Sequence, residues 1–313
     1  MTLSRSTFIR AALTHLRSTL DAAAAEIGCG ILPVGTHPWS SWRDQAVEDG
    51  RARFRRMEDQ YQVLARQQVI CGCHVHVGIA DPDVAVATMG RVRPWLPTLL
   101  ALSANSPFWS GTDTGYDSYR LEVWERWPTA GVPPDLEDRE AYDEVVDELR
   151  AGGAIEDATH LYWYLRPSDR WPTLEFRAMD VALDIDTAVA IAGLARALVR
   201  TEIDAAGRGV AAIESTSEMV GAALWRAARY GLHEQLVSPG AGEPRPAAAV
   251  VGELLDVVGD ALDEAGDRAE VNALVAGILE RGNGADRQRG AVAADGGLEG
   301  VVAMARGSVA VPD

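Results

Sequence analysis

The order of the predicted elements indicates an α+β fold in which strands precede a long helical region. Three observations predict it: an alternating strand-like run at residues 71–79, two further strand-like runs at 160–167 and 172–180, and an almost continuous helical pattern beyond Asp184. Because helices do not alternate regularly with these strands, a βαβ arrangement is not expected. The 313 residues can bury a large core, and we expect one domain over residues 1–313.

The chain is predicted to begin with an amphipathic helix that ends near Gly28 or Gly30. A second helix is predicted over residues 51–67, directly before the first strand. The first helix is predicted from apolar residues at helical spacing, which are Phe8, Ala12, Leu16, Leu20 and Ala23.

The helix after the first strand has a clear start signal. Asp81 can cap it, and Pro82 suits the first turn, where a backbone N–H has no helical partner. Pro94 and Pro97 should bend or split this helix. The polar and aromatic segment that follows, residues 103–134, is read as a long loop, and loops of this length in compact domains are often functional.

Helices are predicted again at residues 138–153 and, after the two later strands, over most of the C-terminal part. The stretch at 238–248 is read as a loop between helices because it is rich in glycine and proline. The clearest late helix has apolar residues at i, i+3, i+4, i+7 and i+8, which are Val271, Leu274, Val275, Ile278 and Leu279.

The composition excludes several classes of function. The chain has 29 basic and 46 acidic residues, a net charge of −17, and every basic residue is arginine. A Walker A lysine, a Schiff-base lysine and an adenylated lysine are therefore impossible. The acidity argues against nucleic acid or an anionic membrane as the main partner.

The cysteines and the apolar runs predict a cytoplasmic protein. Cys29, Cys71 and Cys73 are odd in number, and two of them are one residue apart, which suits reduced thiols. No apolar run approaches the roughly 20 residues of a membrane span. The N-terminal segment lacks the continuous apolar region of a secretion signal.

The run "CGCHVHVGI" at 71–79 places two histidines on one side of a strand. Side chains alternate along a strand, so His74 and His76 share a face with Gly78, and the cysteines lie on the other face. A zinc site built from all four side chains is disfavoured, since they cannot converge. We expect the cysteines to pack in the core, and the two imidazoles either to bind an ion or to be merely exposed.

A second strand repeats this pattern. In "TLEFRAMD", Glu175 and Arg177 share one face, whereas Leu174 and Phe176 lie on the other. The pair could form a plain salt bridge. Two strands with paired polar groups suggest instead that both line one cavity, in which histidine and glutamate bind a cation and arginine binds an anion.

These two segments resemble the bacterial type 2 glutamate–cysteine ligases, or carboxylate–amine ligases, a family with a glutamine synthetase-like catalytic domain. The resemblance runs in order through nearly the whole chain. It implies a mainly antiparallel sheet with helices packed on one side. The segments that carry it further are "GTHPWSSWRDQ", "RPWLPTLLALSANSPFWSGTDTGYDSYR", "WPTAGVPP", "LYWYLRPS", "WRAARYGL" and "GADRQR".

The resemblance implies an ATP-dependent ligase. ATP would phosphorylate a carboxylate, typically that of glutamate, and an amine, typically that of cysteine, would attack the acyl phosphate to give a γ-glutamyl amide. His74 and Glu175 would bind the Mg²⁺ (or Mn²⁺) that bridges the ATP phosphates. His76 would lie near these phosphates, and Arg177 would stabilise the charge of the transferring phosphoryl group.

Three other arginines are candidates for the small-molecule substrates. Arg120 is expected to hold a substrate carboxylate. Arg226 and Arg229 are further candidates, with surface charges on a late helix as the alternative. The sequence does not fix the oligomeric state, for which we consider a homodimer.

The chain departs from the family pattern at two places. Relatives open with a strand that carries a G-[VI]-E-x-E motif, whose carboxylates help to bind the metals, and this sequence contains no such strand. An asparagine before "WRAARYGL" is also replaced, by "GAAL". We therefore expect weak Mg²⁺–ATP binding, little ligase activity and an exposed edge on the first strand.

Two other functional classes stay open. A metal-dependent amidohydrolase also begins with an HxH strand, but it needs further strand-borne histidines, and the last third of this chain is helical. A catalytically impaired relative could act as a binding or interaction protein. ADP formation in the presence of glutamate would distinguish the ligase from a catalytically impaired relative. Bound zinc with hydrolase activity would support the amidohydrolase.

Overall fold

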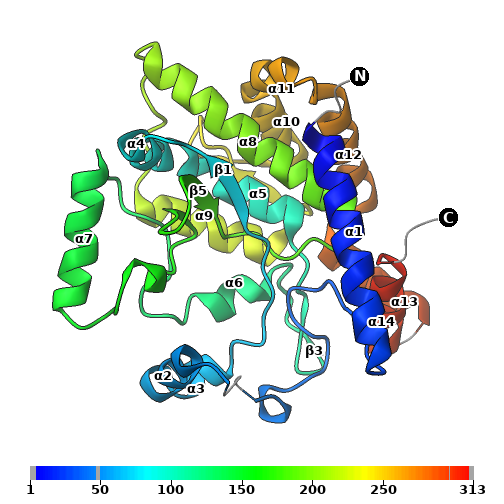
Figure 1. Ribbon diagram of the computed structural model, residues 1–313. Coiled ribbons are helices and arrows are strands. Elements are labelled where there is room, and N and C mark those ends of the chain that lie inside the picture. The colour runs from blue at the N-terminus through cyan, green and yellow to red at the C-terminus, as the bar shows by residue number, and fades with distance from the viewer. Residues whose placement is uncertain (1–4, 47–49, 296, 310–313) are drawn as a thin grey trace.

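The computed structural model describes residues 5–46, 50–295 and 297–309, and its architecture confirms the predicted α+β class (Figure 1). The central sheet is antiparallel and has the strand order β1-β5-β4. Its strands are β1 (Val75–Gly78), β5 (Thr173–Phe176) and β4 (Leu165–Pro167). All three come from the predicted strand segments, although each is shorter than predicted. No helix in the described part combines the length and apolar character needed to cross a bilayer.

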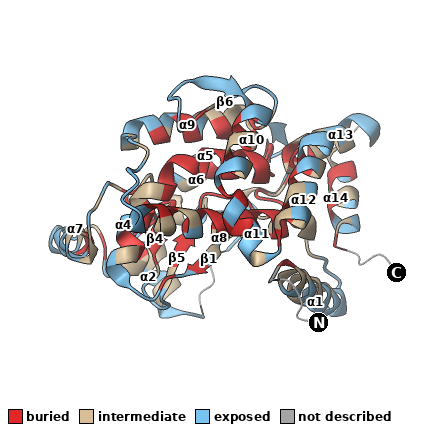
Figure 2. Ribbon diagram, turned by 90° about the horizontal axis from the view of Figure 1, so that it is seen from above, coloured by how far each residue is buried: buried red, intermediate tan, exposed pale blue. Residues whose placement is uncertain are grey.

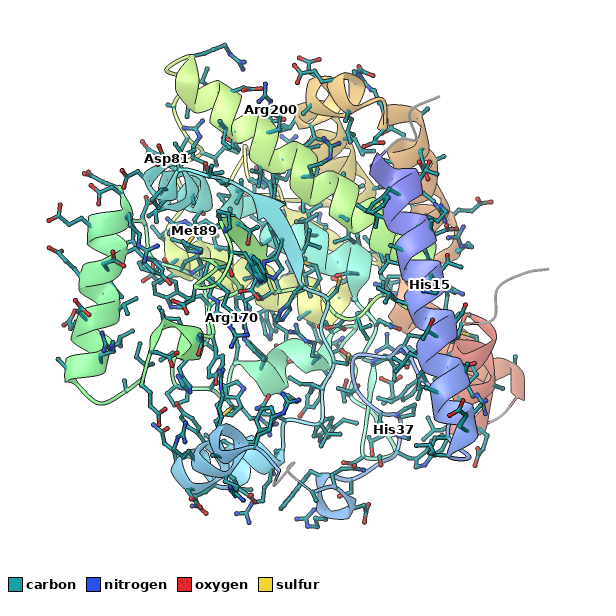
Figure 3. All side chains as sticks on the ribbon, in the orientation of Figure 1. His15, His37, Asp81, Met89, Arg170 and Arg200 are labelled. Atoms are coloured by element: carbon teal, nitrogen blue, oxygen red, sulfur yellow. The ribbon has the colours of Figure 1, made fainter. Side chains whose placement is uncertain are left out.

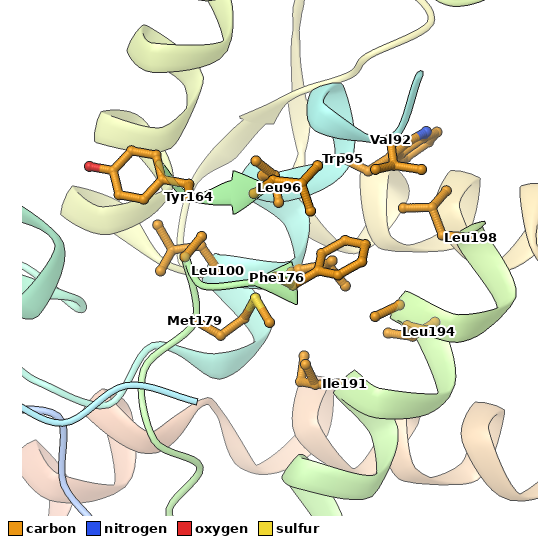
Figure 4. Close-up of a cluster of buried hydrophobic side chains, with 14 of the residues drawn as sticks. Val92, Trp95, Leu96, Leu100, Tyr164, Phe176, Met179, Ile191, Leu194 and Leu198 are labelled. Atoms are coloured by element: carbon orange, nitrogen blue, oxygen red, sulfur yellow. The ribbon is translucent and has the colours of Figure 1, made fainter. Parts of the chain in front are cut away.

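Three helices cover one face of this sheet: α4 (Pro82–Val92), α5 (Leu96–Ser103) and α8 (Ile185–Gly207). Phe176 of β5 points into this layer, toward Leu194 and Leu198 of α8 and Leu100 of α5 (Figure 4). The burial colours follow the same layer, with α5, α8 and β5 mostly buried and α7 largely exposed (Figure 2). The opposite face of the sheet is left for polar side chains.

The other elements surround this core. The two-stranded sheets are β2 (Phe108–Trp109) with β3 (Thr112–Asp113) and β6 (Gln235–Val237) with β7 (Pro244–Pro246). The 3₁₀ turns are η1 (Trp42–Asp44), η2 (Arg93–Trp95) and η3 (Ala158–His160). The remaining helices are α1 (Arg5–Glu26), α2 (Ala52–Tyr61), α3 (Val63–Arg66), α6 (Tyr119–Trp124), α7 (Arg139–Ala151), α9 (Ser217–Tyr230), α10 (Ala247–Val257), α11 (Gly259–Ala265), α12 (Arg268–Arg281), α13 (Gly284–Asp295) and α14 (Leu298–Gly307).

Local signals predicted several helix boundaries correctly. The Asp81 carboxylate accepts hydrogen bonds from the backbone N–H groups of Asp83 and Val84, with Pro82 in the first turn of α4. Pro94 and Pro97 split the predicted helix, as expected. The 3₁₀ turn η2 separates its two parts, α4 and α5. Most of the chain beyond Asp184 is helical, and Val271, Val275 and Ile278 are the buried residues of α12.

Two helix predictions and two loop predictions were wrong in detail. The predicted apolar face of α1 is exposed at Phe8, Leu16 and Leu20. The stripe one position further on, at Ile9 and Leu13, instead lines a groove against α8, because this alanine-rich helix has apolar residues on more than one face.

The predicted helix at 51–67 is split into α2 and α3 at Gln62, which has a positive φ of 53°. The segment 103–134 is not one long loop, since it contains β2, β3 and α6. The loop predicted at 238–248 contains β7, which pairs with β6.

Candidate functional site

The polar face of the central sheet places the predicted residues side by side. Strand register pairs His76 with Glu175 and Glu175 with Arg166, so these three side chains form a row across β1, β5 and β4. His74 lies two residues before His76, and Arg177 lies two residues after Glu175. Antiparallel pairing therefore brings both to the same face.

Glu175 is the centre of this group. Its Oε1 lies 2.9 Å from Nδ1 of His74 and 3.6 Å from Nε2 of His76. Arg166 donates from Nε to Oε2 at 3.0 Å, and a terminal nitrogen of Arg177 lies 3.3 Å from both carboxylate oxygens. The structure thus brings together all four residues that strand alternation predicted to share one face.

Arg166 is a site residue that the sequence analysis missed. Besides Glu175, it donates to three backbone carbonyls, those of Ala158, Thr159 and Leu161. The "HLYWYLRP" segment was read as a strand, but only the register of β4 with β5 shows that Arg166 faces Glu175. A search for charged residues on every predicted strand could have found it.

Burial and charge set the protonation of this group. The side chains of Glu175, Arg166 and Arg177 are only 7%, 9% and 6% exposed. Burial alone would raise the pKa of Glu175, but the hydrogen bond from His74 and the charges of Arg177 and Arg166 hold it well below its usual range. Burial, and then the charge of Arg166, lower the pKa of Arg177 to about 10, so this guanidinium stays charged at neutral pH.

The pKa of His74 is lowered too, which favours the uncharged form of this side chain. Burial lowers the pKa of His74, and the charges of Arg177 and Arg120 add to this, although the hydrogen bond to Glu175 opposes it. A neutral imidazole keeps one ring nitrogen with a free electron pair, which is the form that binds metal ions. His76 is fixed from its other side, because its Nδ1 lies 2.8 Å from the Thr173 hydroxyl.

This group forms one wall of a cavity with a volume of about 580 Å³. Five of the lining residues are arginines, against two with carboxylates. In a chain with a net charge of −17, this local excess of positive charge indicates a binding site for an anion. The lining residues are Arg51, Arg53, Phe54, Met57, His74, His76, Thr159, Tyr162, Arg166, Ser168, Asp169, Arg170, Trp171, Glu175 and Arg177.

Two buried donors in this wall have no protein partner. Among the described residues, neither Nε of Arg177 nor the Tyr162 hydroxyl makes a hydrogen bond. A buried donor without an acceptor costs roughly 1–3 kcal/mol. Both line the cavity, so a ligand with several acceptor oxygens would satisfy them.

Comparison with known proteins identifies the family. Residues 4–304 match the model of Glutamate-cysteine ligase family 2 (GCS2). The chain belongs to this family. It is 40% identical over 281 residues to "Putative glutamate--cysteine ligase 2" of Rhodopirellula baltica, covering 90% of this chain and 75% of that protein. It is 44% identical over 285 residues to "Putative glutamate--cysteine ligase 2-2" of Mycolicibacterium smegmatis, covering 91% of this chain and 72% of that protein.

Among solved structures, the chain is similar to the Pup ligase PafA of the prokaryotic ubiquitin-like modification pathway, determined in complex with ADP. That likeness has a TM-score of 0.40 and 13% sequence identity. It covers 96% of this chain and 58% of PafA.

The donor set of this GCS2 chain is compatible with a magnesium ion. Mg²⁺ is usually bound through one or two carboxylates together with substrate phosphates, rather than by a complete protein cage. Glu175 supplies one carboxylate, and Oε1 of that carboxylate is the atom to which Nδ1 of His74 and Nε2 of His76 both turn. Arg177 and Arg166 already neutralise Glu175, so the phosphates would have to supply most of the negative charge.

Arg120 does not line the cavity. It is buried, and its two terminal nitrogens donate to the backbone carbonyls of Ala178 and Arg177 at 2.9 and 3.1 Å. Its predicted role in holding a substrate carboxylate stays a prediction, and in this structure the side chain supports the strand that carries Arg177.

Arg226 and Arg229 lie on α9, away from the cavity lining. Arg226 donates to the Gln235 carbonyl at 2.6 Å, and Arg229 donates to the Gly115 carbonyl and lies over the ring of Tyr116. Their substrate roles likewise stay predictions.

The cysteine face of β1 is only partly in the core. Cys73 packs against the core with Val75 and Val77, whereas Cys71 is exposed, so the expectation that both thiols are buried was wrong for Cys71. All three cysteines are free, as expected. Burial raises the pKa of the Cys73 thiol, which disfavours its reactive thiolate form.

A second charged cluster was not predicted. Ligand atoms of Asp117, His233 and Asp286 lie within 4.8 Å of one another. Arg289 donates to Asp117, and His233 contacts Asp286, so both carboxylates already have partners within the protein. Asp286 and Arg289 belong to the "GADRQR" segment, which therefore holds the end of α9 and the loop before α6 together.

Proposed function

We propose that this chain is an ATP-dependent carboxylate–amine ligase of the glutamate–cysteine ligase type. In the first step, a carboxylate oxygen attacks the γ-phosphorus of ATP, the bond to the β–γ bridging oxygen breaks, and ADP leaves. In the second step, an amine nitrogen attacks the carbonyl carbon of the acyl phosphate, inorganic phosphate leaves with the electron pair, and the amine loses a proton to give an amide.

The observation that carries this proposal is the row of basic side chains around Glu175. Phosphoryl transfer spreads negative charge over the equatorial oxygens, and catalysis consists mainly of positioning and charge stabilisation. Arg177 and Arg166 are held rigidly by Glu175 and by backbone carbonyls. Rigid donors of this kind stabilise developing charge without needing to reorganise.

Four residues of the polar face take part in the proposed reaction. The Arg177 guanidinium, which lines the cavity, stabilises the charge of the transferred phosphoryl group, and His76 lies near the nucleotide phosphates. His74 and Glu175 would hold Mg²⁺ or Mn²⁺, which would neutralise the triphosphate. The excess of arginine in the cavity explains how a lysine-free acidic protein can attract ATP.

The test measures ADP formation by the purified chain with ATP, Mg²⁺, glutamate and cysteine, together with mass spectrometry of the amide product. We expect slow ADP formation that depends on both amino acids and is lost in Glu175→Gln, with exposed Arg150→Lys as the matched control. ATP binding without any turnover would contradict the ligase and favour the alternative of a non-catalytic binding protein. Bound zinc with hydrolase activity would favour an amidohydrolase.

The metal assignment has its own measurement. Mn²⁺ should broaden the NMR signals of His74 and His76 selectively, because a paramagnetic ion relaxes nuclei near it. Glu175→Gln should weaken this effect. Unchanged broadening in that variant would show that the metal binds elsewhere.

A further inference from the structure

Trp171 is presented to the solvent at the mouth of the candidate site. It lies in the turn between β4 and β5, is 66% exposed and lines the same cavity as Arg166 and Arg177. It is the most exposed tryptophan of the described residues. Its indole makes no hydrogen bond or ring contact within the described part of the chain, although indoles usually contribute through burial or stacking.

Backbone hydrogen bonds order the turn that carries this indole. The Ser168 N–H donates to the Thr173 carbonyl at 2.9 Å, and the Thr173 N–H donates to the Trp171 carbonyl at 2.7 Å. Pro172 restricts the backbone further, and its carbonyl accepts from the Ile79 N–H at 2.9 Å. The exposed ring is therefore carried by an ordered hairpin.

The cavity has two chemically different parts. Its wall on the sheet holds the buried arginines Arg166 and Arg177 and the two histidines around Glu175. The α2 side contributes the apolar side chains of Phe54 and Met57 beside Arg53, and the hairpin contributes Trp171 and Arg170. In Figure 3, Arg170 lies between the sheet and the α2–α3 pair, which agrees with this arrangement. The volume of about 580 Å³ is within the usual 300–1,000 Å³ of small-molecule sites.

We infer that Trp171 is a stacking platform for the base of the nucleotide whose phosphates contact Arg166 and Arg177. This inference rests on the proposed function, because it assumes that a nucleotide is the anionic substrate. A ligand that has both a polyanionic group and a flat ring matches a lining that combines several arginines with an exposed indole. Stacking on an indole does not read hydrogen-bonding edges, so Trp171 should favour a base over no base and discriminate little between adenine and guanine.

The experiment compares ATP with inorganic triphosphate, which has the charge but no base. Binding of each is measured by calorimetry to the wild-type chain, Trp171→Ala and Trp171→Phe. Removal of a stacking ring should weaken ATP binding by roughly 10- to 100-fold. Trp171→Phe should restore most of the affinity, and triphosphate binding should change by less than twofold in both variants.

Two controls separate the possible failures. Trp39→Ala removes another exposed indole that does not line the cavity, and it should leave ATP affinity unchanged. Arg166→Gln should weaken ATP and triphosphate alike. If the wild-type chain binds neither probe, the proposed function fails; if it binds ATP and Trp171→Ala binds it equally well, only the stacking inference is overturned.

Discussion

Two arginine–carboxylate clusters lie on the same segment of chain, five residues apart, and have opposite characters. Glu175 with Arg166 and Arg177 faces the cavity, whereas Asp180 and Arg120 are completely enclosed. Asp180 accepts hydrogen bonds from the Asn105 N–H at 2.8 Å and from the hydroxyls of Ser106 and Ser118 at 2.6 and 2.9 Å. Both of its oxygens are used within the protein.

The difference lies in where the two arginines are placed. Arg120 donates from both terminal nitrogens to the backbone carbonyls of Arg177 and Ala178, and it does not line the cavity. Arg177 lines the cavity and donates to Glu175, and Nε of both arginines has no hydrogen-bond partner among the described residues. Burial raises the pKa of Asp180 and lowers that of Arg120, as expected for groups held in the interior for structure. Residue type alone does not separate the two roles.

In the enclosed cluster, the Arg120 side chain also lies very close to the backbone at Gly72. A Cβ on Gly72 would lie 2.4 Å from a terminal nitrogen of Arg120, a distance that side chains do not adopt. Gly72 therefore leaves the space that Arg120 fills behind β1. The first glycine of the "CGCHVHVG" segment belongs to the enclosed cluster, and the histidines of the same segment belong to the cavity.

The largest expected effect is on stability, at Asp180. Asp180→Ala removes the acceptor for three buried donors, the Asn105 N–H and the hydroxyls of Ser106 and Ser118. Each buried donor left without an acceptor costs about 1–3 kcal/mol, so the combined loss should be about 3 kcal/mol or more. Urea denaturation should show this loss, while exposed Asp143→Ala, which breaks only a surface pair with Arg139, should change stability by less than about 0.5 kcal/mol. Equal, small effects would show that the enclosed cluster is not structural.

The next effect is on turnover, at Arg177. Lysine keeps the charge of arginine but cannot reproduce its planar set of donors. Loss of one well-placed donor commonly reduces turnover by roughly 100-fold or more. We expect Arg177→Lys to lower ADP formation by about that factor at saturating ATP, with only a few-fold change in ATP affinity. Parallel losses of turnover and affinity would indicate a salt bridge that only maintains the cavity.

The matched substitution in the enclosed cluster should reverse this pattern. Arg120→Lys cannot bond to two carbonyls in the same way, and an unsatisfied buried group costs about 1–3 kcal/mol. Thermal denaturation should detect this loss, whereas turnover per folded molecule should fall less than in Arg177→Lys. If Arg120→Lys instead raised the KM for glutamate without lowering stability, the substrate role predicted from the sequence would be correct.

Strand alternation explains why much of the site was predictable. The period of two along a strand is local, so His74, His76, Glu175 and Arg177 could be assigned to faces from the sequence alone. Their convergence on one carboxylate follows from the register of β1 with β5, which pairs residues about 100 positions apart. The same long-range register hid Arg166, since nothing in its own segment shows which strand lies beside it.

The predictions for the Arg120 segment and for the buried face of the first helix were wrong for a similar reason, since both depend on tertiary contacts. Arg120 is the second residue of α6, inside a segment read as a loop, so no periodicity indicated that its side chain points inward. In α1, two apolar stripes lie one residue apart, and only packing against α8 selects Ile9 and Leu13 over Phe8 and Leu16. Local patterns fix which residues share a face, and tertiary contacts decide which face is buried.

The smallest expected effect concerns Glu122, which lies on the same helix as Arg120 but in neither cluster. Its Oε1 has no hydrogen-bond partner among the described residues. Burial, followed by the charge of Glu125, raises the pKa of Glu122 to about 7, and Arg126 offsets this only in part. Without a paired arginine of the kind that Glu175 has, the half-buried carboxyl of Glu122 therefore keeps its proton to a higher pH.

The raised pKa of Glu122 determines how the stability of the fold changes with pH. The folded state holds the Glu122 proton more tightly than the unfolded state, whose pKa is near 4.5. The contribution of Glu122 to stability is therefore complete at or below the unfolded pKa and is lost as the pH rises through the folded pKa of about 7. Glu122→Gln, which stays neutral, should flatten the fall in urea midpoint between pH 5.5 and pH 8, whereas exposed Glu280→Gln should leave it unchanged. Because the variant removes only this titration, wild-type and Glu122→Gln curves that stay parallel over the whole range would show that the carboxylate is already ionised in the fold, as the paired carboxylate of Glu175 is.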